Sequence, residues 1–213
     1  MAMDRDRIVD EALLLLNEVG IDKLTTRKLA ERLGVQQPAL YWHFANKSAL
    51  LDAVNSEMLA RFHKHRLPSP GQDWVDFTYA NARSMRSTLL AVRDGARLTA
   101  GTRPSVTDFA DAELTLKVYV DVGFSAEEAL NISISAARYV VGYVLEEQGE
   151  RERNEEDAGQ EGDIGAELAA FPLLSEAFDA LVDMGTVNTE KAFESGLRYM
   201  IDGMQAALAG KLR

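Results

Sequence analysis

The sequence has no cysteine and few histidines, and both scarcities remove classes of function. Without cysteine, its 213 residues form neither disulfides nor thiolate metal sites, and they offer no cysteine nucleophile. The three histidines, His43, His63 and His65, belong to no metal-binding or hydrolytic motif, and no phosphate-binding glycine loop is present. Apolar runs such as 139–145 are far shorter than the roughly 18 residues that span a bilayer. The sequence therefore predicts neither an enzyme nor a membrane protein.

Basic residues are outnumbered overall, with a net charge of −11, but they are distributed unevenly. Residues 1–66 contain ten basic and nine acidic residues, whereas the remainder contains 13 basic and 25 acidic ones. Within residues 21–51, five basic residues face only two acids, which favours a local positive surface for nucleic acid. Alternating Asp and Arg residues precede the first apolar run and do not resemble a signal peptide, so we expect a cytoplasmic protein.

Apolar residues recur with helical spacing almost throughout the chain, which predicts an all-α protein. Turn residues, including Pro68, Pro70 and Gly71, separate the helices. The expected helices lie at about 5–19, 27–33, 37–44, 47–63, 73–92, 94–99, 106–122, 126–147, 167–182 and 189–208. Residues 146–163 carry nine acids, two arginines and three glycines, and this composition predicts a flexible acidic loop.

Residues 26–43 have the layout of a helix-turn-helix. Thr25 or Thr26 is suited to cap the first of its two short helices, and Gly34 to make the turn. The residues expected to face outward are Thr26, Arg27, Lys28, Gln36, Gln37, Tyr41, His43 and Lys47, a mixture suited to base edges and phosphates. The alternative is a small helical hairpin with a solvated charged face.

The same region carries a resemblance to a known family. The segments LTTRKLA at 24–30, LGV at 33–35 and PALYWH at 38–43 resemble the DNA-binding region of the tetracycline repressor family. Further segments resemble the tetracycline-type repressors in order and spacing, namely LLDA at 50–53, RDGA at 93–96, GTRP at 101–104, GFS at 123–125 and VLE at 144–146. The resemblance is strong over about residues 5–148.

The resemblance implies a homodimer of all-α subunits. Each subunit would have a three-helix, helix-turn-helix DNA-binding domain at 1–46, a connecting helix at 47–66, and a ligand-binding core at 67–213 that dimerises through a four-helix bundle. The implied function is transcriptional repression in an antibiotic response: the dimer binds a palindromic operator and is released by a tetracycline-like or other polycyclic inducer. The alternatives are an all-α small-molecule-binding protein or an enzyme with no role on DNA, and a helical adaptor.

The resemblance also assigns roles at the DNA. Arg27 would read a guanine and Gln37 an adenine, and both side chains have the fork of polar groups that such base edges require. Around them, the implied contacts are Pro38, Tyr41 and His43 on thymine methyls or the backbone and Thr26 and Lys47 on phosphates, with Lys28, Ala39 and Trp42 completing the surface. Ala39 stands where these repressors commonly have Thr, so we expect a different operator sequence.

In the core, His63 and Asn81 match the polar anchors of the family's ligand, which enters as a magnesium chelate. Thr102, Arg103 and Pro104 match a loop that moves on induction, and Glu146 matches an acid that holds a magnesium-bound water. Four positions depart from the pattern: Thr99 replaces the imidazole that binds magnesium, Thr115 a glutamine, Met85 an aromatic wall, and Arg138 a frequent histidine. A threonine hydroxyl anchors magnesium weakly. We therefore expect a weak response to magnesium–tetracycline.

From the residues alone, His63 and His65 also suit an exposed helix end, and Arg138 suits either an anionic ligand or a nearby acid.

The last helix has an unusually broad apolar stripe. It comprises Phe193, Leu197, Met200, Ile201, Met204 and Leu208, with the small residues Gly196, Gly203 and Ala207 beside it. The pattern suits a subunit interface, in which case a charge at Leu197 or Met204 would separate the subunits. It suits equally a helix that closes the core of its own chain.

Overall fold

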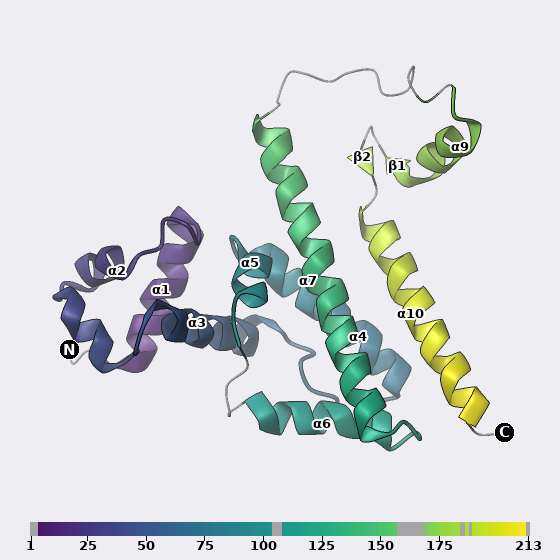
Figure 1. Cartoon of the computed structure of the whole chain (residues 1–213), viewed down its shortest axis with the longest axis horizontal. Helices are drawn as coiled ribbons and strands as arrows, with labels where there is room; N and C mark the ends of the chain where they lie inside the picture. The colour runs from purple at the N-terminus through teal and green to yellow at the C-terminus, as the bar shows by residue number, and fades with distance from the viewer. Residues whose placement is uncertain are drawn as a thin grey trace. The chain divides into compact units, whose positions relative to one another are not determined.

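The computed structural model describes residues 4–103, 108–156, 168, 170–183, 186–187 and 189–211. These residues form helices almost throughout, which confirms the all-α prediction (Figure 1). The helices are α1 (Arg5–Val19), α2 (Thr26–Leu33), the 3-10 helix η1 (Gln37–Trp42), α3 (Lys47–Phe62), α4 (Trp74–Ala91), α5 (Gly95–Ala100), α6 (Asp108–Val120), α7 (Ala126–Glu156), α9 (Pro172–Leu181) and α10 (Thr189–Lys211). The two-residue strands β1 (Val182–Asp183) and β2 (Thr186–Val187) pair with each other in antiparallel orientation. Among the described residues, no helix is long and apolar enough to cross a membrane.

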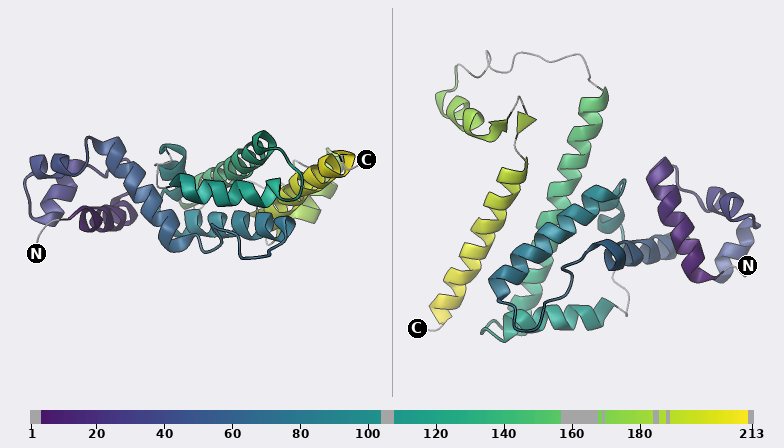
Figure 2. Two further views of the ribbon diagram at one scale, coloured as in Figure 1. Left: turned by 90° about the horizontal axis from the view of Figure 1, so that it is seen from below. Right: turned by 180° about the vertical axis from the view of Figure 1, so that it is seen from behind.

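The chain divides into two compact units, Met1–Leu145 and Glu146–Arg213. In the first unit, α1, α2 and η1 pack together, and α3 runs from them toward α4 and α5 (Figure 2). The apolar residues of these N-terminal helices form their core, including Ile8, Ala12, Leu16, Leu29, Leu40, Leu50, Val54 and Met58, each at most 2 % exposed. Burial of this set orients the short helices, which are too short to be stable alone.

Local capping sets the ends of the N-terminal helices. The Thr25 hydroxyl accepts a hydrogen bond from the backbone N–H of Lys28, so Thr25, rather than Thr26, caps α2. Gly34 ends α2 with φ 70°, a left-handed conformation that glycine adopts without strain. The third predicted helix is a 3-10 helix that ends at Trp42, two residues earlier than expected. Asn46 caps α3, because its side-chain oxygen accepts from the backbone N–H of Ala49 at 2.8 Å.

The second part of the first unit begins with α4 and contains an aromatic cluster. Trp74 on α4 lies edge-on to Tyr119 and Phe124, with ring centroids 6.3 and 5.7 Å away. The start of α7 is a capping box: the Ser125 hydroxyl accepts from the N–H of Glu128, and the Glu128 carboxylate accepts from the N–H of Ser125. The aromatic contacts hold α4 and α6 against the segment that leads into α7.

The prediction of an acidic loop from residue 146 was wrong for residues 146–156, which continue α7. Glu, Gln and Arg are favourable helix formers, and one glycine within an established helix is tolerated. The acidic composition indicated exposure correctly for Glu146, but Glu147 is only 5 % exposed. Residues 157–163 lie outside the described part of the chain.

The apolar stripe of α10 separates into two faces. Phe193, Leu197, Ile201 and Met204 are buried within the single chain, at most 9 % exposed. Met200 and Leu208 are half-buried, whereas Gly203 and Ala207 on the adjacent face are exposed. A Cβ added at Gly203 has no described atom within 4 Å. The helix therefore contributes to its own chain's core and still leaves a smooth face accessible.

Candidate DNA-reading surface and ligand pocket

The residues predicted to contact DNA gather on α2, η1 and the start of α3. Arg27 is 81 % exposed, and its Nε donates to Glu31 Oε1 one turn later at 3.0 Å. Such an exposed pair contributes little stability, so the guanidinium can leave this partner at small cost. Lys28 and Pro38 are exposed, and Thr26, Ala39, His43 and Lys47 are partly so.

Gln37 is positioned by its neighbours. Its Nε2 donates to Thr26 Oγ1 at 2.8 Å and to Tyr41 Oη at 3.4 Å, so the amide is held between α2 and the far end of η1. Tyr41 is 48 % exposed, and Trp42 is 89 % exposed. An indole exposed to that extent has no role in the core of the chain. Gln37, Tyr41 and Trp42 thus present polar and aromatic groups on the short helix η1.

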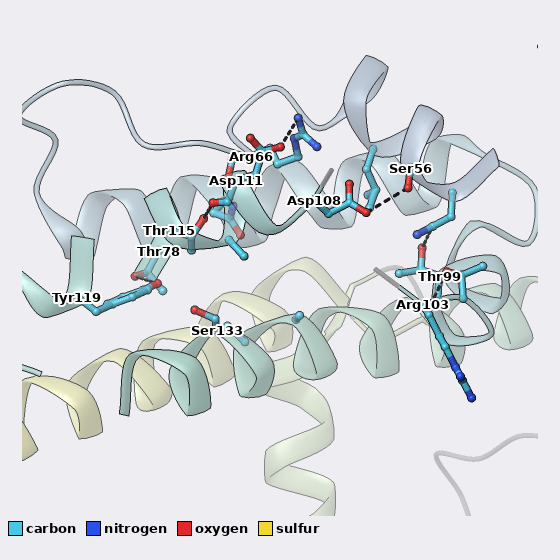
Figure 3. Close-up of a pocket in the computed structure, with 17 residues that line it drawn as sticks. Ser56, Arg66, Thr78, Thr99, Arg103, Asp108, Asp111, Thr115, Tyr119 and Ser133 are labelled. Atoms are coloured by element: carbon cyan, nitrogen blue, oxygen red, sulfur yellow. Dashed lines mark hydrogen bonds and ion pairs between the residues drawn. The ribbon is translucent and has the colours of Figure 1, made fainter. Parts of the chain in front are cut away.

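A cavity of about 330 Å³ lies in the first unit, lined by residues from α3 to α7 and the connections between them (Figure 3). Of the predicted ligand residues, Asn81, Thr99, Thr102, Arg103 and Thr115 line it. These residues are up to 34 positions apart in sequence, and the fold brings them to one site. Its volume lies within the range of small-molecule sites.

Four of the other predicted ligand residues, His63, Met85, Arg138 and Glu146, are not among the residues that line this cavity. His63 and Met85 are each 8 % exposed, and His63 is bonded to the backbone of Asn81, which does line it. Arg138 and Glu146 are exposed on α7. Pro104 lies outside the described residues. The suggestion that His63 occupies an exposed helix end was wrong, because the chain after α3 folds back against α4.

Several lining residues were missed by the sequence interpretation. They are Asn55, Ser56 and Leu59 on α3, Arg66, Thr78 on α4, Asp108, Asp111, Ala112 and Tyr119 on α6, and Ser133, Ala136 and Ala137 on α7. The available signal was helical spacing of small and polar residues: Asp108, Asp111 and Thr115 share one face of α6, and Ser133, Ala136 and Ala137 share one face of α7. Such a face is unusual in a helix of a protein core.

Charged groups line the cavity between α3 and α6. Arg66 Nη2 lies 2.7 Å from Asp111 Oδ2, and both side chains are partly buried. The Ser56 hydroxyl donates to Asp108 Oδ2 at 3.4 Å, which links α3 to the first turn of α6. The backbone N–H of Arg103 donates to Asp52 Oδ1 at 3.1 Å. The start of α6 and the residues after α5 are thus both attached to α3.

Thr99 stands where the family resemblance implies an imidazole. Its hydroxyl has two acceptors within reach, Asn55 Oδ1 at 2.8 Å and the Gly95 carbonyl at 3.0 Å. Within the described part of the chain, no three histidine or acidic side chains gather as a metal site. A neutral alcohol is a weaker anchor for a metal ion than the imidazole of the family pattern. Thr99 therefore does not supply the metal ligand that the family resemblance implies at this position.

His63 is held in one tautomer. Its Nε2 lies 3.1 Å from the Asn81 carbonyl oxygen, which only accepts, so Nε2 carries the proton. Burial lowers the pKa of His63 from 6.5 to about 4, and the hydrogen bond to the Asn81 carbonyl opposes this only in part. His63 is therefore neutral at neutral pH and acts as a structural support of α4.

Acidification should destabilise the protein through His63. Between pH 6.5 and 4 the unfolded chain binds a proton at His63 and the folded chain does not, so the free energy of unfolding decreases as the pH is lowered. Above pH 6.5 the residue is neutral in both states and the effect is absent. Between pH 7.5 and pH 5 the parent should lose about 2 kcal/mol more of its free energy of unfolding than His63→Asn does. Urea unfolding at equal protomer concentration measures this difference. The exposed His65→Asn variant serves as the control and should keep the parent's pH dependence; equal slopes in all three proteins would contradict the assignment.

Asp94 joins the cavity side of the unit to the N-terminal helices. Its Oδ2 accepts from the backbone N–H of Ile21 at 2.7 Å, and its Oδ1 accepts from Arg97 at 3.0 Å. Arg97 also pairs with Asp22 at 2.9 Å, and this hydrogen bond lowers the pKa of Asp22. Gly20 has φ 78°, and a Cβ there would lie 2.9 Å from Asp94 Oδ2, so glycine is required for the approach. α5, which carries Thr99, is thereby attached to the junction between α1 and α2.

A helix-turn-helix attached to a helical core with its own polar cavity defines a class of protein, the ligand-responsive DNA-binding regulators. Comparison with known families agrees: residues 8–54 match the bacterial regulatory proteins of the tetR family, and residues 67–208 match the tetracyclin repressor-like C-terminal domain. The chain therefore belongs to the tetR family. Proteins of this family are transcriptional repressors, not enzymes, and bind operator DNA as homodimers that respond to a ligand.

Curated relatives and solved structures support this membership over nearly the whole chain. The tetracycline repressor protein class A from transposon 1721 of Escherichia coli is 49% identical over 197 residues, 92% of this chain and 88% of the relative. A structure of class A TetR in complex with 5a,6-anhydrotetracycline and magnesium is 41% identical, with a TM-score of 0.72 and coverage of 94% and 97% of the two chains. A TetR variant from Acinetobacter baumannii AYE in complex with minocycline is 40% identical, with a TM-score of 0.79 and coverage of 97% and 99%.

Proposed function

We propose that this repressor reads a palindromic operator through α2 and η1 and is released when a polycyclic inducer occupies the cavity. The observation that carries the proposal is the attachment of α5 to both sites: Thr99 lines the cavity, and Asp94 and Arg97 bind Ile21 and Asp22 beside α2. The residues proposed to contact DNA are Thr26, Arg27, Lys28, Gln37, Pro38, Ala39, Tyr41, Trp42, His43 and Lys47.

The mechanism is a population shift. A ligand that contacts Thr99 and Thr102 displaces α5, and the hydrogen bonds at Asp94 transmit the displacement to the turn before α2. In a dimer, a change in the spacing of two recognition segments removes the fit to successive major grooves. Because such coupling is reciprocal, operator DNA must weaken ligand binding by the same factor as ligand weakens operator binding.

The proposed domain boundaries are 1–46 for DNA binding, 47–66 for the connecting helix and 67–213 for ligand binding and dimerisation. A DNA partner supports the proposed cytoplasmic location. His63, Met85, Arg138, Glu146 and Pro104 remain proposed ligand residues on the family resemblance. Of these, His63 acts through its hydrogen bond to the Asn81 carbonyl, which holds a residue that lines the cavity.

The inducer is proposed to differ from a magnesium–tetracycline chelate. The relatives' ligands make a polycyclic body the first expectation, and the cavity suits one in size. The Thr99 hydroxyl, engaged with Asn55 and Gly95, does not supply the imidazole of the family pattern. No step of the proposed release therefore depends on a metal ion.

Titration with tetracycline, with and without magnesium, tests this point. We expect weak binding that magnesium improves less than tenfold, because a neutral hydroxyl adds less than about 1.4 kcal/mol to ion binding. Thr99→His should restore a magnesium dependence of at least about tenfold, whereas Thr99→Ala should behave like the parent. Tight, magnesium-dependent binding by the parent that Thr99→Ala leaves unaltered would show that the site anchors the chelate by other groups.

Operator binding and release are tested together in a gel-shift assay. Duplexes selected from a random pool should contain a palindrome, and addition of a polycyclic inducer should release the selected duplex from the protein. Failure to enrich any palindrome would contradict the proposed DNA contacts. Retention of DNA at saturating ligand, shown by calorimetry on the same preparation, would contradict the proposed coupling through α5.

A further inference from the structure

One end of the cavity is lined by hydroxyl groups from three helices. Thr78 of α4 and Tyr119 of α6 lie on one side, and Ser133 of α7 lies across the cavity from them (Figure 3). Thr78 and Tyr119 are 2 % and 3 % exposed. A site for a polycyclic ligand otherwise requires apolar walls. The hydrogen bonds that these hydroxyl groups already make therefore decide what they can offer to a ligand.

The protons of these hydroxyls are engaged within the protein. Thr78 Oγ1 donates to the Trp74 carbonyl at 2.7 Å, and Ser133 Oγ donates to the Ala129 carbonyl at 2.9 Å. Thr115, one turn before Tyr119, donates in the same way to the Asp111 carbonyl at 3.0 Å. A carbonyl oxygen only accepts, so in each case the hydroxyl is the donor. Each hydroxyl has a single proton and retains only lone pairs for a ligand.

The same reasoning orients Tyr119. Its Oη lies 3.0 Å from Thr78 Oγ1, whose proton points to Trp74, so Tyr119 must donate to Thr78. Burial raises the pKa of Tyr119, which keeps the phenol protonated and able to donate. Asn81 completes the pattern, because its Nδ2 donates to the carbonyls of His65 and Arg66 at 3.0 and 3.2 Å. Only its oxygen is left for a ligand.

The charged groups that line the cavity are paired or distant from this end. Arg66 is paired with Asp111, one turn before Thr115, and Arg103 lies toward the opposite end of the view from Tyr119 (Figure 3). Because the Asp111 carboxylate is already paired with Arg66, this end favours a neutral donor over an ammonium group. Apolar side chains that line the same cavity are Leu59, Ala112, Ala136 and Ala137.

We propose that the end of the cavity formed by Thr78, Tyr119 and Ser133 binds a hydroxyl group on an aromatic ring system and accepts its hydrogen bond. The inference rests on the proposed function in taking this cavity as the inducer site, and it specifies the inducer class. A ligand that offers only acceptors at this end, such as an ether or ketone, leaves the oxygens of the protein without donors.

The test compares 2-naphthol with 2-methoxynaphthalene, which keeps the ring and the oxygen but lacks the proton. Isothermal titration of the full-length dimer without DNA should give at least about fivefold tighter binding of 2-naphthol. Thr78→Val leaves the Tyr119 proton free to donate, so this variant should lose the preference or favour the ether. Ser133→Ala should reduce the preference. Thr88→Val is the matched control, because Thr88 makes the same bond, to Ser84 of α4, and lies outside the cavity.

Three results would overturn the proposal: equal affinities for the two probes, no binding of 2-naphthol up to about 1 mM, or an unchanged preference in Thr78→Val. A folded Thr78→Val protein is verified by its circular dichroism, and Ser133→Ala provides a second reading if that variant is unstable. Because binding is measured without DNA, a hydroxyl preference together with failure to release operator would contradict the proposed function and not this assignment.

Discussion

Replacement of Arg27 by alanine should weaken binding to the selected operator by about 1–3 kcal/mol and relax specificity at one base pair of each half-site. Arg27 is 81 % exposed on α2 and has only Glu31 as a partner, so the substitution removes a base contact without disturbing the core. Lys47→Ala should instead weaken binding to all sequences alike and reduce the salt dependence by about one unit per phosphate contact. Fluorescence anisotropy with operator and single-base variants at several salt concentrations distinguishes the two effects.

Lys117→Ala controls for the loss of charge. Lys117 lies on α6 and pairs with Asp121, so its removal changes net charge equally without touching α2 or η1. Lys117→Ala should alter neither the discrimination between the operator and its single-base variants nor the dependence of operator affinity on salt concentration. Operator discrimination that survives Arg27→Ala would show that another side chain reads that base pair.

A charge placed at Gly203 should abolish dimerisation. Gly203 lies on the exposed face of α10, and an added Cβ has no described atom within 4 Å, so Gly203→Arg should leave the monomer folded. Burial of an arginine against a second copy is strongly unfavourable. Operator affinity should fall at least about 100-fold, because each half-site is then bound without the second.

Analytical ultracentrifugation of Gly203→Arg at micromolar concentration measures the expected monomer directly. Gly203→Ala is the matched control, since it adds a Cβ at the same position, where no described atom lies within 4 Å, but introduces no charge. A dimer in Gly203→Arg would place the interface on another surface. The buried Leu197 is a poor choice for this test, because a charge there disrupts the core of the chain itself.

The family pattern and the structure agree where the determinants are local. Thr25, Gly34 and Asn46 cap helices whose apolar residues recur every three or four positions, and both signals are read within one or two turns of chain. The error at residues 146–156 had a local cause too: charge indicates exposure, whereas helix formation depends on propensity, which Glu and Arg satisfy. Composition alone does not separate an exposed helix from a loop.

By itself, the sequence determined the helices, the helix-turn-helix and the outward position of residues such as Arg27, because helical periodicity and capping act between neighbours in the chain. Only the tertiary structure decided which polar residues share a cavity, since Thr78, Tyr119 and Ser133 come from three helices. It also decided that Asp94 binds Ile21, 73 residues earlier, and that α10 has both a buried and an exposed face. These features depend on packing between distant segments, and apolar spacing within one helix does not specify which partner covers it.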